Sequence, residues 1–205
     1  MAGFPSRFLR YLVLLWSAAA LTVAGTGLFT KLPVFAVQIA IGLQMLVFLA
    51  VLALAPALRE HLLSLNLRAL TAFHVWRVLP GSLFLYDYYV LHQLPWSFAV
   101  PGGYGDILVA LTAIPASWLA KGSGSSRMLL LAWQSLAFFD LAGVVRAGLV
   151  NGLHNPESMR PLTHLPLSLL PAMLVPLTFM MHVIAVAQIG QGLRQASVRA
   201  VAANK

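Results

Sequence analysis

Residues 33–57, PVFAVQIAIGLQMLVFLAVLALAPA, form an apolar stretch that contains no charged side chain. About 20 apolar residues suffice for a helix to cross the hydrocarbon core of a bilayer. This stretch is long enough to do so, and the rest of the chain repeats the pattern. The sequence therefore predicts an all-α membrane protein, a single domain over residues 1–205, with six transmembrane helices near residues 8–29, 33–57, 69–91, 104–120, 128–150 and 165–190.

The composition supports this fold class. The chain is 60% hydrophobic and 9% charged, against about 25% charged in an average soluble domain. It has no cysteine, which excludes disulfides, iron–sulfur clusters and thiolate chemistry. The net charge of +8 does not indicate nucleic-acid binding, because the basic residues sit at the ends of apolar segments rather than on one face.

The basic residues also predict the orientation of the chain. If the N-terminus is inside, nine lysines and arginines flank the inner ends of the spans and only Lys31 and Arg160 flank the outer ends. Cytoplasmic loops of membrane proteins carry such an excess of positive charge. We therefore expect both termini in the cytoplasm and the loop of residues 151–164 outside.

Several ionisable residues fall inside or at the edge of the predicted spans. An ionised group at the bilayer centre costs roughly 2.5–3.5 kcal/mol on insertion scales, so such residues usually face a protein interior. The predicted topology sorts them by depth into two groups. The outer group holds Asp87, Asp106 and Arg146, and the inner group holds His74, Arg77, Asp140 and His182.

The cost of burial predicts that opposite charges pair within each group. We expect Arg146 to approach Asp87 or Asp106, and Arg77 to approach Asp140. Such pairs can simply fix the register of the helices. Alternatively, Arg77, Asp106, Asp140 and His182 line one connected polar interior, in which a carboxylate without a strong partner can carry a proton.

Proline and glycine predict irregular helices. Pro80-Gly81 predicts a kink in the third span, and Pro166, Pro171 and Pro176 predict a kinked sixth span. Two prolines and three glycines between Pro95 and Asp106 predict a break before the fourth helix, which Asp106 would then cap.

Histidine spacing offers an alternative. His74 and His92 are eighteen residues apart, as are His164 and His182, so each pair falls on one face of a helix after five turns. If the third and sixth spans are neighbours, His74 faces His182 and His92 faces His164. Paired axial histidines of this kind can bind haem b.

The chain resembles a family of uncharacterised bacterial multi-pass membrane proteins with the signature LP..FA.PAG.GD. The matching residues are Leu94-Pro95, Phe98-Ala99 and Pro101 to Asp106, followed by Phe139-Asp140-Leu141 and by a last helix with Pro166, Pro171, Pro176 and His182. The match covers residues 74–185, and it departs at Gly102 and Gln134, where the family pattern has Ala and Asn. The resemblance strengthens Arg77, Asp106, Asp140 and His182 as site candidates and implies the inner membrane of a bacterium, but it implies no activity.

No nucleophile elbow, metalloprotease helix, phosphate-binding loop or dinucleotide fingerprint occurs, so the sequence favours a protein other than an enzyme. We expect a polar site between the later helices that binds or translocates a small solute or protons, with no cofactor. The candidate binding residues are Arg77, Asp87, Asp106, Asp140, Arg146 and His182. A haem-binding electron-transfer subunit and a structural subunit of a larger membrane complex, or a homo-oligomer, are the alternatives.

Overall fold

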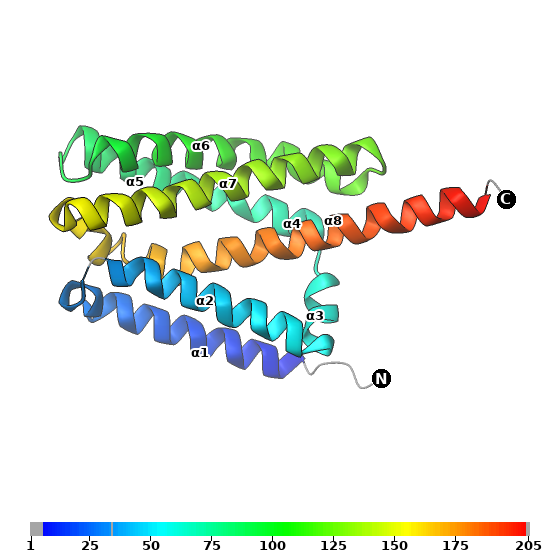
Figure 1. The fold of residues 1–205 in the computed structure, drawn as a ribbon, viewed down its shortest axis with the longest axis horizontal. Coiled ribbons are helices and arrows are strands. Elements are labelled where there is room, and N and C mark those ends of the chain that lie inside the picture. Colours follow the sequence, from blue (N-terminus) through cyan, green and yellow to red (C-terminus); the bar gives the residue numbers. More distant parts are fainter. Residues whose placement is uncertain (1–5, 34, 204–205) are drawn as a thin grey trace.

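The computed structural model describes residues 6–33 and 35–203, and these residues form helices and turns with no strand. The long helices run roughly side by side along one axis (Figure 1). The start of α1 and the end of α8 lie toward the same end of this bundle. This arrangement agrees with a chain whose first and last helices begin and end on one side of a membrane.

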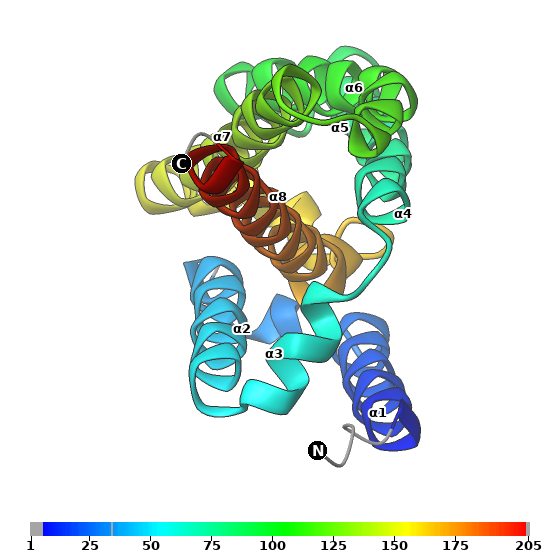
Figure 2. The ribbon, with the colours of Figure 1, turned by 90° about the vertical axis from the view of Figure 1, so that its right-hand side faces the viewer.

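An antiparallel pair of helices begins the chain. α1 (Ser6–Gly25) and α2 (Phe35–Leu54) are joined through a 3₁₀ turn, η1 (Leu28–Lys31). Gly27 precedes this turn with φ 67°, a left-handed conformation that glycine adopts without a steric cost. The pair lies beside the other helices (Figure 2), and Trp16 Nε1 donates to Gln44 Oε1 at 2.9 Å between α1 and α2.

The third predicted span is made of several short pieces. After α3 (Pro56–Leu63), which crosses the end of the bundle, the chain continues as α4 (Leu67–Ala72), a 3₁₀ helix η2 (Phe73–Arg77) and α5 (Val78–Tyr89). The Asn66 side chain caps α4 by accepting from Ala69 N at 3.1 Å. Irregular helical geometry therefore lies at residues 73–77, ahead of Pro80, which stands in the first turn of α5 where a proline is tolerated.

The fourth predicted span contradicts one expectation. α6 (Trp96–Trp118) is continuous through Pro101, Gly102, Gly103 and Gly105, so the predicted break before residue 104 is wrong, and Asp106 is not a cap. Pro95 precedes the helix instead, and a 3₁₀ turn, η3 (Leu119–Lys121), follows it. The glycines allow close packing on both sides of the helix: a Cβ on Gly103 would lie 2.7 Å from Leu85 of α5, and a Cβ on Gly105 would lie 2.0 Å from Asp140 of α7.

The last two long helices complete the bundle. α7 (Ser125–His154) leads into a 3₁₀ segment, η4 (Pro156–Thr163), at the end of the molecule opposite to the start of α1. A π-helical stretch, η5 (Leu170–Leu174), then opens α8 (Val175–Ala203). Pro171 lies within this stretch and Pro176 in the first turn of α8, so the irregular geometry of the last span is concentrated at its beginning.

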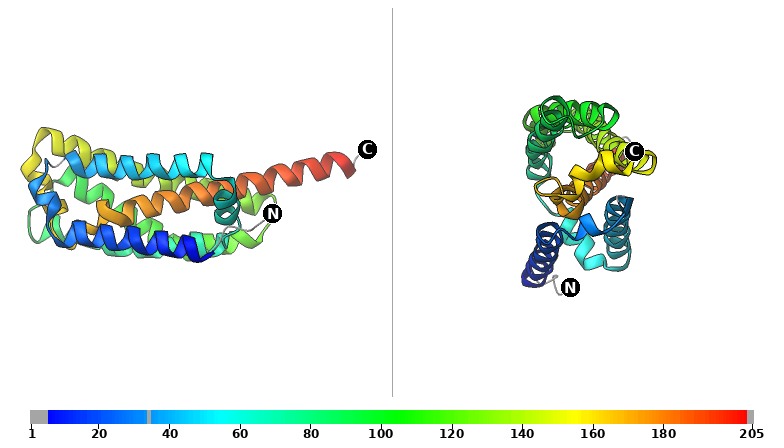
Figure 3. Two further views of the ribbon diagram at one scale, coloured as in Figure 1. Left: turned by 90° about the horizontal axis from the view of Figure 1, so that it is seen from below. Right: turned by 90° about the vertical axis from the view of Figure 1, so that its left-hand side faces the viewer.

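Within the described residues, four helical segments are long and apolar enough to cross a membrane: Phe35–Leu54, Trp96–Lys121, Ser125–His154 and Leu170–Val198. A shorter apolar segment, Arg10–Gly25, lies in α1. Large apolar side chains cover the outside of these helices: Leu43, Leu46, Leu111, Leu136 and Phe139 are each at least 59% exposed. In water such a surface would be unfavourable, whereas lipid tails solvate it well. The elongated bundle seen from below and from its end is consistent with this environment (Figure 3).

Candidate buried polar site

Polar side chains from two helical segments meet inside the bundle. Thr71, His74 and Arg77 follow one another along α4 and η2, and a 3₁₀ helix has three residues per turn, so the last two lie above one another. Gln134 and Asp140 lie six residues apart on α7, with Ala137 between them, and their side chains reach Thr71 and Arg77 respectively. These two rows face each other and make a buried polar column along the bundle.

Arg77 forms the charged part of the column. It is fully buried, and Nε donates to Asp106 Oδ1 of α6 at 2.6 Å. Nη2 donates to Asp140 Oδ2 of α7, and Nη1 donates to the Ala137 carbonyl at 3.1 Å. One guanidinium thus joins three segments of the chain, and we call Arg77, Asp106 and Asp140 the charge triad. The predicted pair of Arg77 with Asp140 is confirmed.

The two carboxylates of the charge triad differ in their access to the surface. The Asp106 side chain is 5% exposed, whereas the Asp140 side chain is 27% exposed. Asp140 borders a cavity of about 290 Å³ between α6 and α7, whose other lining residues include Ser97, Pro101, Gly143 and Arg146. The charge triad therefore has one enclosed side and one open side, and the open side is at Asp140.

Glycines make the charge triad possible. A Cβ atom on Gly105 would lie 2.0 Å from Asp140 Oδ1, so any larger residue there would displace the carboxylate. A Cβ on Gly81 would lie 2.7 Å from the Gly103 carbonyl oxygen and 2.9 Å from Asp106 Cβ. Small residues at these positions allow α5, α6 and α7 to approach closely, as in many membrane helix pairs.

A pair of histidines forms the second part of the column. His74 of η2 and His182 of α8 are both fully buried, and their rings stack with centroids 4.0 Å apart and planes 15° from parallel. Trp133 lies beside the His74 ring and Phe138 beside the His182 ring, with centroids 5.8 and 6.2 Å away. The expectation that His74 faces His182 is confirmed.

A chain of hydrogen bonds determines how His182 is held. Thr71 Oγ1 donates to the Leu67 carbonyl at 2.9 Å, so it can accept from Gln134 Nε2 at 3.1 Å. That leaves Gln134 Oε1 to accept from His182 Nδ1 at 2.6 Å. His182 Nδ1 must therefore carry a proton, and in the neutral ring Nε2 is left with a lone pair.

Three ring nitrogens of this pair have no partner. His182 Nε2 and both nitrogens of His74 are buried and form no hydrogen bond within the described residues. A buried polar atom without a partner costs about 1–3 kcal/mol, so three at one place indicate a role or an enclosed solvent molecule. These three nitrogens are therefore the groups of the column that are free to accept or donate a proton.

The geometry bears on metal and haem binding. In the part of the chain that the structure describes, no group of three or more histidine or acidic side chains could hold a metal ion. The stacked faces of His74 and His182 leave no space for a porphyrin between them at 4.0 Å. No ring contact joins His92 to His164 among the described residues; His92 has φ 55° beyond the end of α5, and His164 Nδ1 lies 3.1 Å from the Arg160 carbonyl oxygen.

The remaining predicted site residues, Asp87 and Arg146, form none of the ion pairs or hydrogen bonds of the column among the described residues, although Arg146 lines the cavity beside Asp140. Arg146 is exposed and, among the described residues, forms no ion pair with Asp87 or Asp106, so that predicted pairing is wrong. Asp87 lines a separate cavity at the end of α5. The reason is that α6 begins at residue 96 rather than 104, which places Asp106 deep enough along the bundle to reach Arg77.

Sequence reasoning missed Thr71 and Gln134 as site residues. Both are fully buried, and they hold His182 through the hydrogen bonds described above. The signal that could have found Thr71 was the repeated spacing of three in Thr71, His74 and Arg77; no such repeat marks Gln134, which stands six residues before Asp140.

The chain belongs to a family that is described as Domain of unknown function (DUF8737), whose model matches residues 34–189. No curated protein matches the chain, and no solved structure matches it. The matched range contains every residue of the charge triad and of the histidine pair.

Proposed function

We propose that this protein is a multi-pass membrane protein whose buried polar column carries protons or binds a small solute that moves with them. The chain would cross the membrane six times: the four long apolar helices, α1, and the combined segment of α4, η2 and α5. Its termini would be cytoplasmic and the membrane would be a bacterial inner membrane, in keeping with the distribution of lysine and arginine.

The observation that carries the proposal is the charge of the triad. One guanidinium faces two carboxylates, so Arg77, Asp106 and Asp140 together carry one net negative charge when all are ionised. A proton or a cationic solute that joins the triad neutralises it, and neutrality is strongly favoured where water is excluded. Asp140 is the carboxylate best placed to exchange that proton, because it borders the cavity between α6 and α7.

The histidine pair extends the same argument along the column. An imidazole with a free Nε2 lone pair can accept a proton, and stacked rings place a second imidazole directly beside it. The column would then offer successive proton-accepting groups from Asp140 toward His182. A column of this kind would work only if water enters between the two parts during transfer.

The test is proton flux into liposomes that contain the purified protein and a trapped pH-sensitive dye. Asp140→Asn keeps the shape of the side chain and removes its charge, so we expect it to abolish protein-dependent flux while the protein stays folded. Arg68→Gln is the control, because Arg68 is exposed on α4, lies outside the charge triad and its cavity, and forms no ion pair among the described residues; it should retain the flux. Flux that persists in Asp140→Asn would overturn the proposal, and a wild-type protein without flux would exclude proton conduction that requires no solute.

Haem b remains an alternative for the histidine pair, and it requires the rings of His74 and His182 to separate. Visible absorbance of the purified protein distinguishes it, because a bis-histidine haem gives intense bands that an apoprotein lacks. A structural role in a larger complex is the third possibility. It predicts partner subunits that remain bound in mild detergent, with the protein inactive in isolation.

A further inference from the structure

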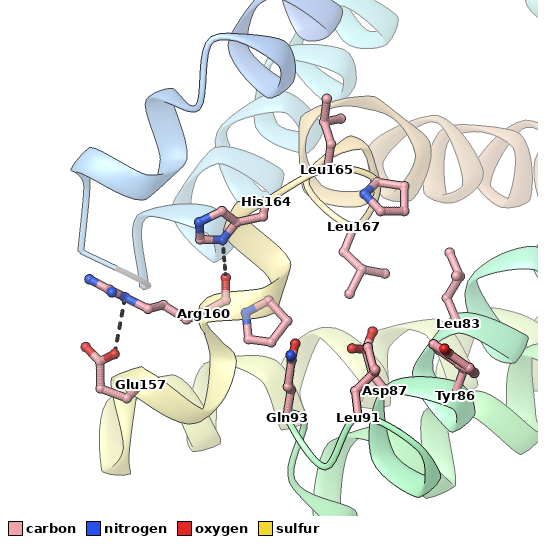
Figure 4. A pocket seen from close by; sticks show the side chains of 12 residues that line it. Leu83, Tyr86, Asp87, Leu91, Gln93, Glu157, Arg160, His164, Leu165 and Leu167 are labelled. Atoms are coloured by element: carbon pink, nitrogen blue, oxygen red, sulfur yellow. Dashed lines mark hydrogen bonds and ion pairs between the residues drawn. The ribbon is translucent and has the colours of Figure 1, made fainter.

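The cavity at the end of α5 is a second polar feature, and it lies apart from the charge triad. Its volume is about 530 Å³, within the usual range of small-molecule sites. Asp87 lines it and stands ten residues after Arg77, about 15 Å along a helix. The opposite wall comes from η4 and the turn before η5 (Figure 4).

Asp87 is the unusual group of this cavity. The residue is only 7% exposed, and among the described residues its side chain forms no ion pair and no hydrogen bond. The arginine of the same cavity does not neutralise it. Arg160 pairs instead with Glu157 at 3.2 Å, and its guanidinium points away from Asp87 in Figure 4.

The remaining walls are mostly apolar. Leu83, Leu91, Leu165 and Leu167 line the cavity with two prolines, and Leu167 lies opposite Asp87 in Figure 4. Tyr86 adds an aromatic ring beside the carboxylate, which can attract a cation over its face. Gln93 and His164 add polar groups to the lining, and Glu157 is paired with Arg160. The cavity therefore combines one unpaired carboxylate with an apolar body and an aromatic edge.

We propose that this cavity binds an ammonium group carried on a small apolar body, with the Asp87 carboxylate as its counter-ion. A divalent metal ion fits less well, because no cluster of three histidine or acidic side chains capable of holding a metal occurs within the described residues. The ammonium can belong to a soluble amine or to the headgroup of an ethanolamine lipid, since both present the same charged group. This site does not depend on the function proposed for the charge triad.

The test is a titration of the purified protein in uncharged detergent with n-butylammonium, and with 1-butanol as a neutral probe of similar size. Isothermal calorimetry should detect binding of the ammonium and a much weaker response to the alcohol. Asp87→Asn should weaken n-butylammonium binding about tenfold or more, as expected for the loss of a charge-assisted contact. Glu60→Gln is the control: this acid is exposed on α3 and does not line the cavity, so its loss should leave the affinity nearly unchanged.

The result that overturns the proposal is n-butylammonium binding that is absent, or equal in Asp87→Asn and in the wild type. If Asp87→Asn fails to fold, the comparison of ammonium with alcohol in the wild type still decides the matter. Equal responses to the two probes would mean that the carboxylate selects no cation.

Bilayer discs separate the two sources of the ammonium. Discs of phosphatidylethanolamine should weaken n-butylammonium binding relative to discs of phosphatidylglycerol if the headgroup occupies the site. Equal affinity in both kinds of disc would assign the cavity to a soluble amine.

Discussion

At the scale of single residues, the site depends on contacts that tolerate no added atom. Gly105 is the clearest case, because a Cβ there would lie 2.0 Å from the Asp140 carboxylate. A carboxylate held by Arg77 has little freedom to move away. The sequence alone marked this glycine as a helix breaker, whereas in the folded chain its missing side chain is what admits Asp140.

We expect Gly105→Ala to destabilise the protein by about 1–3 kcal/mol, the usual cost of overpacking a filled interior. Gly143→Ala, on α7, is the control, because a Cβ there meets nothing within 4 Å. Thermal unfolding in detergent should show a lower midpoint for Gly105→Ala and little change for Gly143→Ala. Equal midpoints would mean that Asp140 is not fixed beside α6.

A second residue-scale prediction concerns the proton on His182. The hydrogen-bond chain through Thr71 and Gln134 requires a proton on Nδ1, so nitrogen NMR of labelled histidine should find one buried ring whose Nδ1 is protonated. Neutral imidazole in water prefers the proton on Nε2. Gln134→Leu removes the acceptor of this proton, so the ring should shift to the other tautomer and the signal of the protonated Nδ1 should disappear. A spectrum that this substitution leaves unchanged would contradict the described network.

At the scale of elements, the sequence was most informative where apolar runs are long. Residues 33–57 predicted α2 because an apolar run without charges has one stable form in lipid. Residues 128–150 predicted α7 because the run is long and apolar in spite of Asp140 and Arg146. The sequence was least informative at residues 95–106, where soluble-protein propensities argue against a helix. The segment is nevertheless helical, because the backbone of a segment inside a membrane needs internal hydrogen bonds. Close packing against α5 also favours glycine at residue 103.

The continuity of α6 can be tested by hydrogen exchange. Amides of Gly103, Tyr104 and Gly105 should exchange as slowly as those of residues 107–112, because the same helix contains both sets. The exposed turn at Ser123 and Gly124 is an internal reference for fast exchange. Fast exchange at residues 103–105 would restore the break that the sequence suggested.

At the scale of the whole molecule, the charge pattern and the arrangement of helices agree on one point. The beginning of α1 and the end of α8 share one end of the bundle, as a protein with both termini on one side requires. The predicted depths of the residues in the membrane also placed Arg77 and Asp140 in one group, and these two residues do pair. The same prediction separated Asp106 from them because the position of a residue in depth depends on where its helix begins, and composition did not reveal that α6 starts at Trp96.

The orientation has a direct test, because the chain contains no cysteine and labelling would have no background. Ser123→Cys lies in the exposed turn after α6, and Asn155→Cys lies at the exposed end of α7, toward the opposite end of the bundle. A membrane-impermeant maleimide should label Asn155→Cys in intact cells and Ser123→Cys only after permeabilisation. The reverse pattern would place both termini outside.

The sharing of one arginine by two aspartates constrains how this family can diverge. Loss of either carboxylate alone leaves a neutral pair, which the interior tolerates, whereas loss of Arg77 first leaves two buried negative charges side by side. Mutational paths therefore have an order: either aspartate can be lost before the arginine, whereas loss of the arginine from the intact triad leaves two unpaired carboxylates. A lineage that has lost Asp106 or Asp140 should still keep its arginine, and one without the arginine should lack at least one of the two aspartates.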